Sequence, residues 1–97
     1  MTRDEFVFTI GFQGDAAIVD SKALKRHRRM STMELAEEGL YRAAFCSAIF
    51  SGGSDEMNQF ISFFGEKTGM SGLTEDRLQR LFGVYTVPDQ VKRIVTV

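Results

Sequence analysis

The pattern of hydrophobic and polar residues predicts a helix in the middle of the chain, from Ser31 to Phe50. Ser31 and Glu34 have the spacing of a capping box, in which each side chain bonds the backbone N–H of the other residue. The first half of this helix is two-sided at helical spacing, whereas the second half, from Ala43, carries no charge. A helix that is apolar all round is covered on every side. We therefore expect the helix to begin at the surface and to bury its second half in the centre of the protein.

The N-terminal part of the chain has the two-residue period of a β-hairpin. From Glu5 to Phe12 one face holds large apolar residues, and a second β-like run, Ala16–Val19, follows. The apolar face is Phe6, Phe8, Ile10 and Phe12, and the other face is Val7, Thr9 and Gly11. A type II′ loop at Gly14-Asp15 sets one pairing register of the two strands. A type I′ loop at Gln13-Gly14 sets another, in which the partner of each residue shifts by two positions. The first register pairs Phe12 with Ala17 and Ile10 with Val19.

Helix-capping signals divide the rest of the chain. Ser21 is a cap for a short helix from Lys22 to about Met30. Ser54 is a cap for a helix that ends near Gly69, and the apolar residues of this helix recur at i, i+3, i+4 and i+7. These residues are Met57, Phe60, Ile61 and Phe64.

A third helix is expected from Thr74 to Gly83, with Leu81 and Phe82 facing inward. The β-branched residues of Val91–Val97 predict a final strand, although helical spacing fits the same run. The expected fold is a single α+β domain over residues 1–97. The N-terminal hairpin and the C-terminal strand form a small sheet, packed against a central helical hairpin and a third short helix.

Composition bounds the class of protein. A chain of 97 residues with 43% hydrophobic and 26% charged residues is typical of one soluble globular domain. Its single cysteine, Cys46, cannot form an internal disulfide. The N-terminus lacks a signal-peptide pattern, and no apolar run reaches the about 18 residues of a membrane span. We expect a cytoplasmic protein without membrane contact.

Charge is distributed unevenly, although the net charge is only −1. The stretch from Lys22 to Arg29, here called the basic segment, holds five of the 12 Lys and Arg residues and no acid. In a helix, Lys22, Lys25, Arg26 and Arg29 lie on one stripe, and Arg28 lies elsewhere. Such a stripe can contact phosphates or an acidic partner. The competing interpretation is a solvated segment whose cations pair with Asp20, Glu34, Glu37 or Glu38.

Surplus apolar residues indicate a second candidate surface. Phe63 lies outside the apolar stripe of its helix, and Phe45 and Ile49 lie opposite the main stripe of the central helix. Packing within the chain accounts for them most simply. Nine phenylalanines are nevertheless many for so small a domain, and large exposed apolar patches mark partner sites. A homo-oligomer or a partner interface is therefore a further hypothesis.

Catalytic and metal-binding signals are weak. The one histidine, His27, stands among cations, and Cys46 lies in the uncharged half of the central helix, where a thiol is usually inert. One His and one Cys cannot form the usual zinc shells, and no phosphate-binding or dinucleotide fingerprint occurs. We expect no catalytic residues, no metal and no cofactor. The preferred hypothesis is a non-enzymatic protein-interaction or regulatory module, and the alternative is a small nucleic-acid-binding domain that uses the basic segment.

Overall fold

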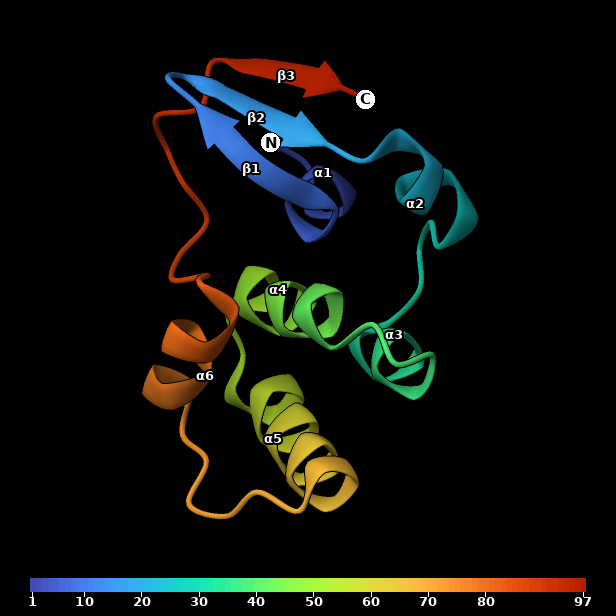
Figure 1. The fold of residues 1–97 in the computed structure, drawn as a ribbon, viewed down its shortest axis with the longest axis vertical. Helices are drawn as coiled ribbons and strands as arrows, with labels where there is room; N and C mark the ends of the chain where they lie inside the picture. Colours follow the sequence, from blue (N-terminus) through green and yellow to red (C-terminus); the bar gives the residue numbers. More distant parts are fainter.

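The computed structural model describes all residues, 1–97, and shows a three-stranded sheet stacked on helices (Figure 1). The sheet contains β1 (Thr9–Gln13), β2 (Ala16–Val19) and β3 (Arg93–Thr96) in the order β1-β2-β3. Helix α4 (Tyr41–Ser51) lies between the sheet and α5 (Ser54–Thr68), so the helical hairpin covers one side of the sheet. The expected α+β fold is confirmed.

The hairpin forms in the register that the type II′ loop predicts at its tip. Phe12 pairs with Ala17, and Gly14 has a φ of 60° at the first loop position. The predicted pairing of Ile10 with Val19 is wrong, because the register shifts between Thr9 and Gly11 and Val19 pairs with Thr9 instead. Ile10 is therefore an extra residue at a bulge, and its side chain is 60% exposed.

The predicted strand Glu5–Phe12 is wrong in its first half, which is helix α1 (Arg3–Val7). Thr2 and Glu5 form a complete capping box at the start of α1. Phe6 and Val7 are neighbours in the sequence, yet both are buried. A half-buried strand would expose one of them, whereas a short helix enclosed between the sheet and α4 buries both.

The basic segment is helical only in part. Helix α2 spans Ser21–Arg26 rather than Lys22 to Met30, and its N-cap is Asp20 rather than Ser21. The Asp20 carboxylate accepts hydrogen bonds from two backbone N–H groups at 3.1 Å each. The Ser21 hydroxyl instead donates to the Val97 carbonyl at 2.6 Å, which ties α2 to the end of the chain.

The single helix predicted from Ser31 to Phe50 is broken into α3 (Thr32–Glu37) and α4. The predicted capping box of Ser31 and Glu34 forms, but Gly39 then adopts a φ of 81°, which ends a helix. After this turn α4 runs through the centre, and its residues Ala44 to Ala48 are all buried. The expectation that the second half of the central helix is covered is therefore confirmed.

The last helices follow the sequence signals closely. Gly53, not Ser54, is the N-cap of α5, and Gly69 ends this helix in the left-handed conformation. Helix α6 (Glu75–Phe82) begins after Thr74, whose side chain accepts from the Arg77 N–H, and ends at Gly83. Leu81 was predicted to face inward but is 54% exposed, whereas Leu78 is completely buried.

The C-terminal run is a strand, and its helical alternative is wrong. β3 pairs in parallel with β2, with Ala17 opposite Ile94. A parallel partner requires a long crossover, and the five segments from α2 to α6 supply it (Figure 1). The N-terminal hairpin and the C-terminal strand therefore meet in one sheet.

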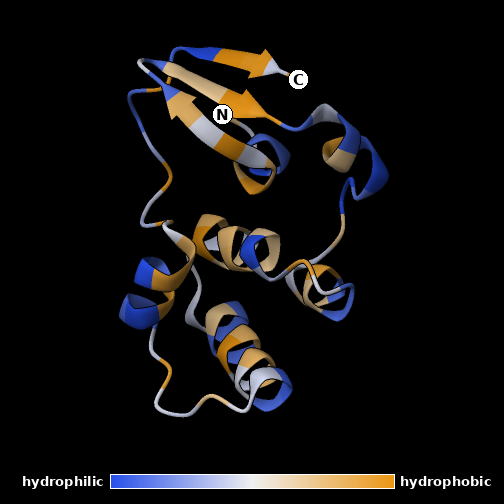
Figure 2. Cartoon of the chain, in the orientation of Figure 1, coloured by the Kyte–Doolittle hydropathy of each residue, from blue (hydrophilic) through white to orange (hydrophobic).

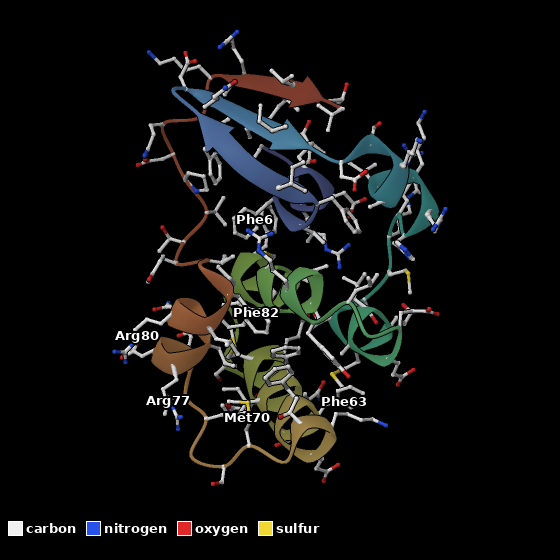
Figure 3. The ribbon with its side chains drawn as sticks, viewed as in Figure 1. Phe6, Phe63, Met70, Arg77, Arg80 and Phe82 are labelled. Atoms are coloured by element: carbon white, nitrogen blue, oxygen red, sulfur yellow. The ribbon has the colours of Figure 1, made fainter.

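Two interior features hold the helices together. Phe82 of α6 lies between α4 and α5, with ring-centroid distances of 5.3 Å to Phe45, 6.3 Å to Phe60 and 5.5 Å to Phe64 (Figure 3). Four of the nine phenylalanines thus form one cluster in the core. No helix combines the length and the apolar character that crossing a membrane requires.

The second feature is a chain of four polar side chains, of which the two in the middle, Ser47 and Thr32, are buried. An Nη2 of Arg3 donates to the Ser47 hydroxyl at 2.8 Å, and Ser47 hydrogen-bonds the Thr32 hydroxyl at 2.7 Å. Thr32 in turn donates to a Glu56 carboxylate oxygen at 2.6 Å. The chain joins α1, α4, α3 and α5 and pairs two buried hydroxyls, so no buried side-chain polar atom lacks a partner.

Candidate functional site

The basic segment forms an exposed, positively charged corner of the molecule. Figure 2 shows it as the hydrophilic colour on α2 and on the turn that follows. Its five cations are all exposed, and none of them lies within 4.0 Å of a carboxylate, because the only ion pairs of the chain are Arg3–Asp4 and Arg93–Asp15. These exposed cations are Lys22, Lys25, Arg26, Arg28 and Arg29.

The acids that were expected to neutralise the segment have other partners or none. Asp20 is occupied by the cap of α2, and Glu34 by the capping box with Ser31. The hydrogen bonds from the Ser31 backbone and side chain lower the pKa of Glu34, so this carboxylate is already stabilised as an anion. Glu37 and Glu38 form no ion pair. The predicted neutralisation by these four acids is therefore wrong.

The chain bends within the basic segment. His27 is the C-cap of α2, and Arg29 then has a φ of 64°, the only positive value at a non-glycine residue. A left-handed conformation costs such a residue about 1–2 kcal/mol. Because of this bend, Arg29 does not continue the helical stripe of Lys22, Lys25 and Arg26, and the predicted four-residue stripe is wrong.

A groove of about 700 Å³ runs between α2 and the start of α4. Lys22, Arg26 and His27 line one side of it, and Phe8 and Leu40 are among its apolar residues. The His27 ring stacks against Phe8, with centroids 6.2 Å apart and an interplanar angle of 25°. The groove thus combines an apolar surface with three cations, Lys22, Arg26 and Arg42, and one acid, Asp20.

The three apolar candidates do not form one surface. Phe45 is 0% exposed and belongs to the core, so a partner cannot reach it. Ile49 is half-buried and lines a hollow together with Ile61 and Leu73. Phe63 is also half-buried, but it follows Ile61 by two residues and so points to the opposite side of α5. The Lys67 ammonium lies 5.5 Å from the centre of the Phe63 ring.

A separate cavity of about 240 Å³ lies between β1, α4 and the segment after α6. Arg42 and Cys46, one turn apart on α4, both line it. Burial raises the pKa of the Cys46 thiol to about 11, so the thiol stays protonated near neutral pH. His27 lines the groove rather than this cavity, and the fold does not join the two residues into a Cys–His pair.

Of the residues around this cavity, sequence reasoning singled out Cys46, as an inert thiol, but not Arg42. These residues come from α1, β1, α4 and the segment after α6, and no local pattern links such distant parts of a chain. No three His, Cys, Asp or Glu side chains gather where they could hold a metal ion. A scan of protein-family models and searches of curated proteins and of solved structures found no match to this chain.

Proposed function

We propose that this protein is a non-enzymatic protein-interaction module that binds an acidic segment of a partner protein through the basic segment. The observation that carries the proposal is the set of five exposed cations without an intramolecular carboxylate. Cations of this kind steer an acidic partner toward the surface and fix how it docks. Binding of an acidic partner costs these cations little free energy, because no existing ion pair has to be broken.

The groove beside α2 supports a protein partner in particular. Leu40 and Tyr41, both half-buried, offer an apolar surface, and Lys22 and Arg26 stand beside it. A peptide with one aliphatic or aromatic anchor between acidic residues matches both parts. We also propose a cytoplasmic location, which the buried free thiol of Cys46 supports, since disulfides are rare in reducing compartments.

Nucleic acid is the less favoured partner. The bend after Arg26 shortens the cationic stripe that would follow a phosphate backbone. The ring of His27 is stacked on Phe8 and is not free to stack on a base. The rest of the chain carries only seven of the 12 Lys and Arg residues but all 13 acids. It is therefore acidic and repels a polyanion.

The test compares two double variants in affinity capture from a nuclease-treated lysate. Lys22→Gln with Arg26→Gln removes two cations of the groove, and Arg80→Gln with Lys92→Gln removes two exposed cations elsewhere. We expect a partner with an acidic segment to be retained by the wild type and by the second variant but lost with the first. Equal recovery by both variants would contradict the proposal.

A parallel titration with labelled duplex and single-stranded oligonucleotides tests the alternative. Contact with four phosphates gives a log–log salt slope near −3.6, from about 0.9 per phosphate for duplex DNA. We expect no binding at 50 mM salt with the protein at about 100 µM, which is the upper part of the usual non-specific range. Binding with the steep slope, lost with Lys22→Gln and Arg26→Gln, would replace the protein partner by a nucleic acid.

A further inference from the structure

The cavity between β1 and α4 is enclosed by three separate parts of the chain. Phe6 of α1 and Phe12 of β1 form one wall, and α4 forms the second. The third wall is the strap, defined here as residues 83–91, which runs alone from α6 to β3 (Figure 1). Seven of the 13 residues around the cavity belong to the strap.

The walls are mainly apolar and carry a single charge. Phe6, Phe12, Val84 and Val91 supply apolar surface, and Arg42 is the only charged residue among those around the cavity. No carboxylate lies within 4.0 Å of the Arg42 guanidinium. A ligand in this cavity therefore meets apolar side chains and one positive charge that no carboxylate of the chain compensates.

Hydrogen bonds hold the Arg42 guanidinium in place. Its Nη1 donates to the Thr9 carbonyl at 2.9 Å, and its Nε donates to the Phe82 carbonyl at 3.3 Å. Its Nη2 has no partner within the chain, so two N–H donors of a fixed cation are free. A guanidinium held in this way loses little freedom when it binds an anion.

The thiol of Cys46, which also lines the cavity, does not repel an anion. The Cys46 thiol is neutral near pH 7, because burial raises its pKa to about 11. The strap allows entry, since residues 86–91 form no hydrogen bond with the rest of the chain. Moving these residues breaks no hydrogen bond.

We propose that this cavity binds a small monocarboxylate with an apolar body, with the carboxylate on Arg42 Nη2 and the body against Phe6, Phe12 and Val84. The size of the ligand follows from the volume. A 150 Å³ apolar cavity holds benzene, so about 240 Å³ accommodates on the order of ten non-hydrogen atoms. Octanoate and 3-phenylpropionate have about this size. The site contains no residue of the basic segment, although Arg42 also lines the groove beside α2.

Titration of the full chain with sodium octanoate, followed by ¹⁵N–¹H NMR, tests the proposal. A ligand of this size is expected to bind with a Kd below about 1 mM. The saturating shifts belong to amides around the cavity, such as those of Thr9, Cys46 and Val84. Octanamide, which is neutral and of the same size, should bind about tenfold more weakly, because a charge-assisted hydrogen bond is replaced by a neutral one.

Variants distinguish the cavity from other surfaces. Phe12→Ala removes part of an apolar wall and should weaken octanoate several-fold, whereas Ile10→Ala, on the same strand but outside the cavity, should not. Both side chains are more than half exposed, so both variants should fold. Arg42→Gln should remove the preference of octanoate over octanamide, and Arg80→Gln should leave it unchanged.

Several results would overturn the proposal. One is the absence of saturation up to 10 mM octanoate, and another is equal affinity for octanoate and octanamide. A third is a set of shifts confined to the basic segment, which would mean that the anion binds at the surface cations. If Arg42→Gln does not fold, the comparison of Phe12→Ala with Ile10→Ala decides, and equal affinities in these two variants would refute the cavity as the site.

Discussion

Replacing Phe45 by alanine should remove much of the stability of the fold. Phe45 is 0% exposed and is among the largest fully buried side chains. Its ring lies 6.0 Å from that of Phe60 and 5.3 Å from that of Phe82. The substitution therefore disrupts the contact between α4, α5 and α6 at one point.

The magnitude follows from burial and from the aromatic neighbours. Phe→Ala changes in a core cost about 3–5 kcal/mol, and each aromatic pair contributes about 0.5–1.5 kcal/mol beyond its buried area. With two such pairs lost, we expect the upper half of the range, about 4–5 kcal/mol. A 97-residue domain has about 5–15 kcal/mol of stability in total, so the variant will be barely folded if the wild type lies near the lower end.

Urea unfolding, monitored by far-UV circular dichroism, gives the free energy of unfolding of the wild type and of the Phe45→Ala variant by linear extrapolation. Phe12→Ala is the matched control, because it removes the same atoms from a ring that is 52% exposed. We expect the control to cost less than about 1 kcal/mol. A cost below about 2 kcal/mol for Phe45→Ala, or equal costs at the two positions, would refute the central place of Phe45 in the core.

Further predictions concern the helix break, the polar chain, a cap and self-association. Gly39→Ala should cost about 1 kcal/mol, because alanine is strained at a φ of 81°, while Gly53→Ala, at a φ of −94°, should cost less in the same unfolding assay. Ser47→Ala removes a buried hydroxyl in the middle of the polar chain and should cost about 2–3 kcal/mol by thermal and urea unfolding. The lowered pKa of Glu34 means that its cap stabilises the protein above the unfolded pKa and that this contribution is lost as the pH falls through the folded value. The stability advantage of the wild type over Glu34→Gln at pH 7 should therefore shrink below pH 4.5, and an advantage that is constant across this range would contradict the cap. If Phe63 serves self-association, Phe63→Glu should lower the mass in sedimentation without changing the far-UV spectrum, and a wild type that is monomeric at high concentration would exclude the homo-oligomer.

Local chemistry made several elements predictable from the sequence. The loop at Gly14 and the pairing of Phe12 with Ala17 depend only on residues close in the chain. The limits of α6, from the Thr74 cap to Gly83, depend on hydrogen bonds within one or two turns. The burial of the uncharged part of α4 followed from its composition.

Other local signals were present but were outweighed by a stronger pattern. Thr2 and Glu5 have capping-box spacing, yet the recurrence of Phe6, Phe8, Ile10 and Phe12 at every second position favoured a strand. The single helix predicted from Ser31 to Phe50 ran through Gly39. In both cases the position of neighbouring elements decided the outcome, because α1 packs against α4 and the turn at Gly39 lets α3 and α4 pack on each other.

The candidate sites divide in the same way. The cations of the basic segment are contiguous, so the sequence alone determined that they exist as a cluster. Only the tertiary structure decided that no acid neutralises them and that a groove runs beside them. The cavity at Arg42 depends on tertiary structure entirely, because the residues of its walls are scattered along the chain between Phe6 and Val91. A sequence pattern records the preferences of neighbouring residues, whereas a cavity is the space left when distant segments pack, and packing is determined only once the whole chain is folded.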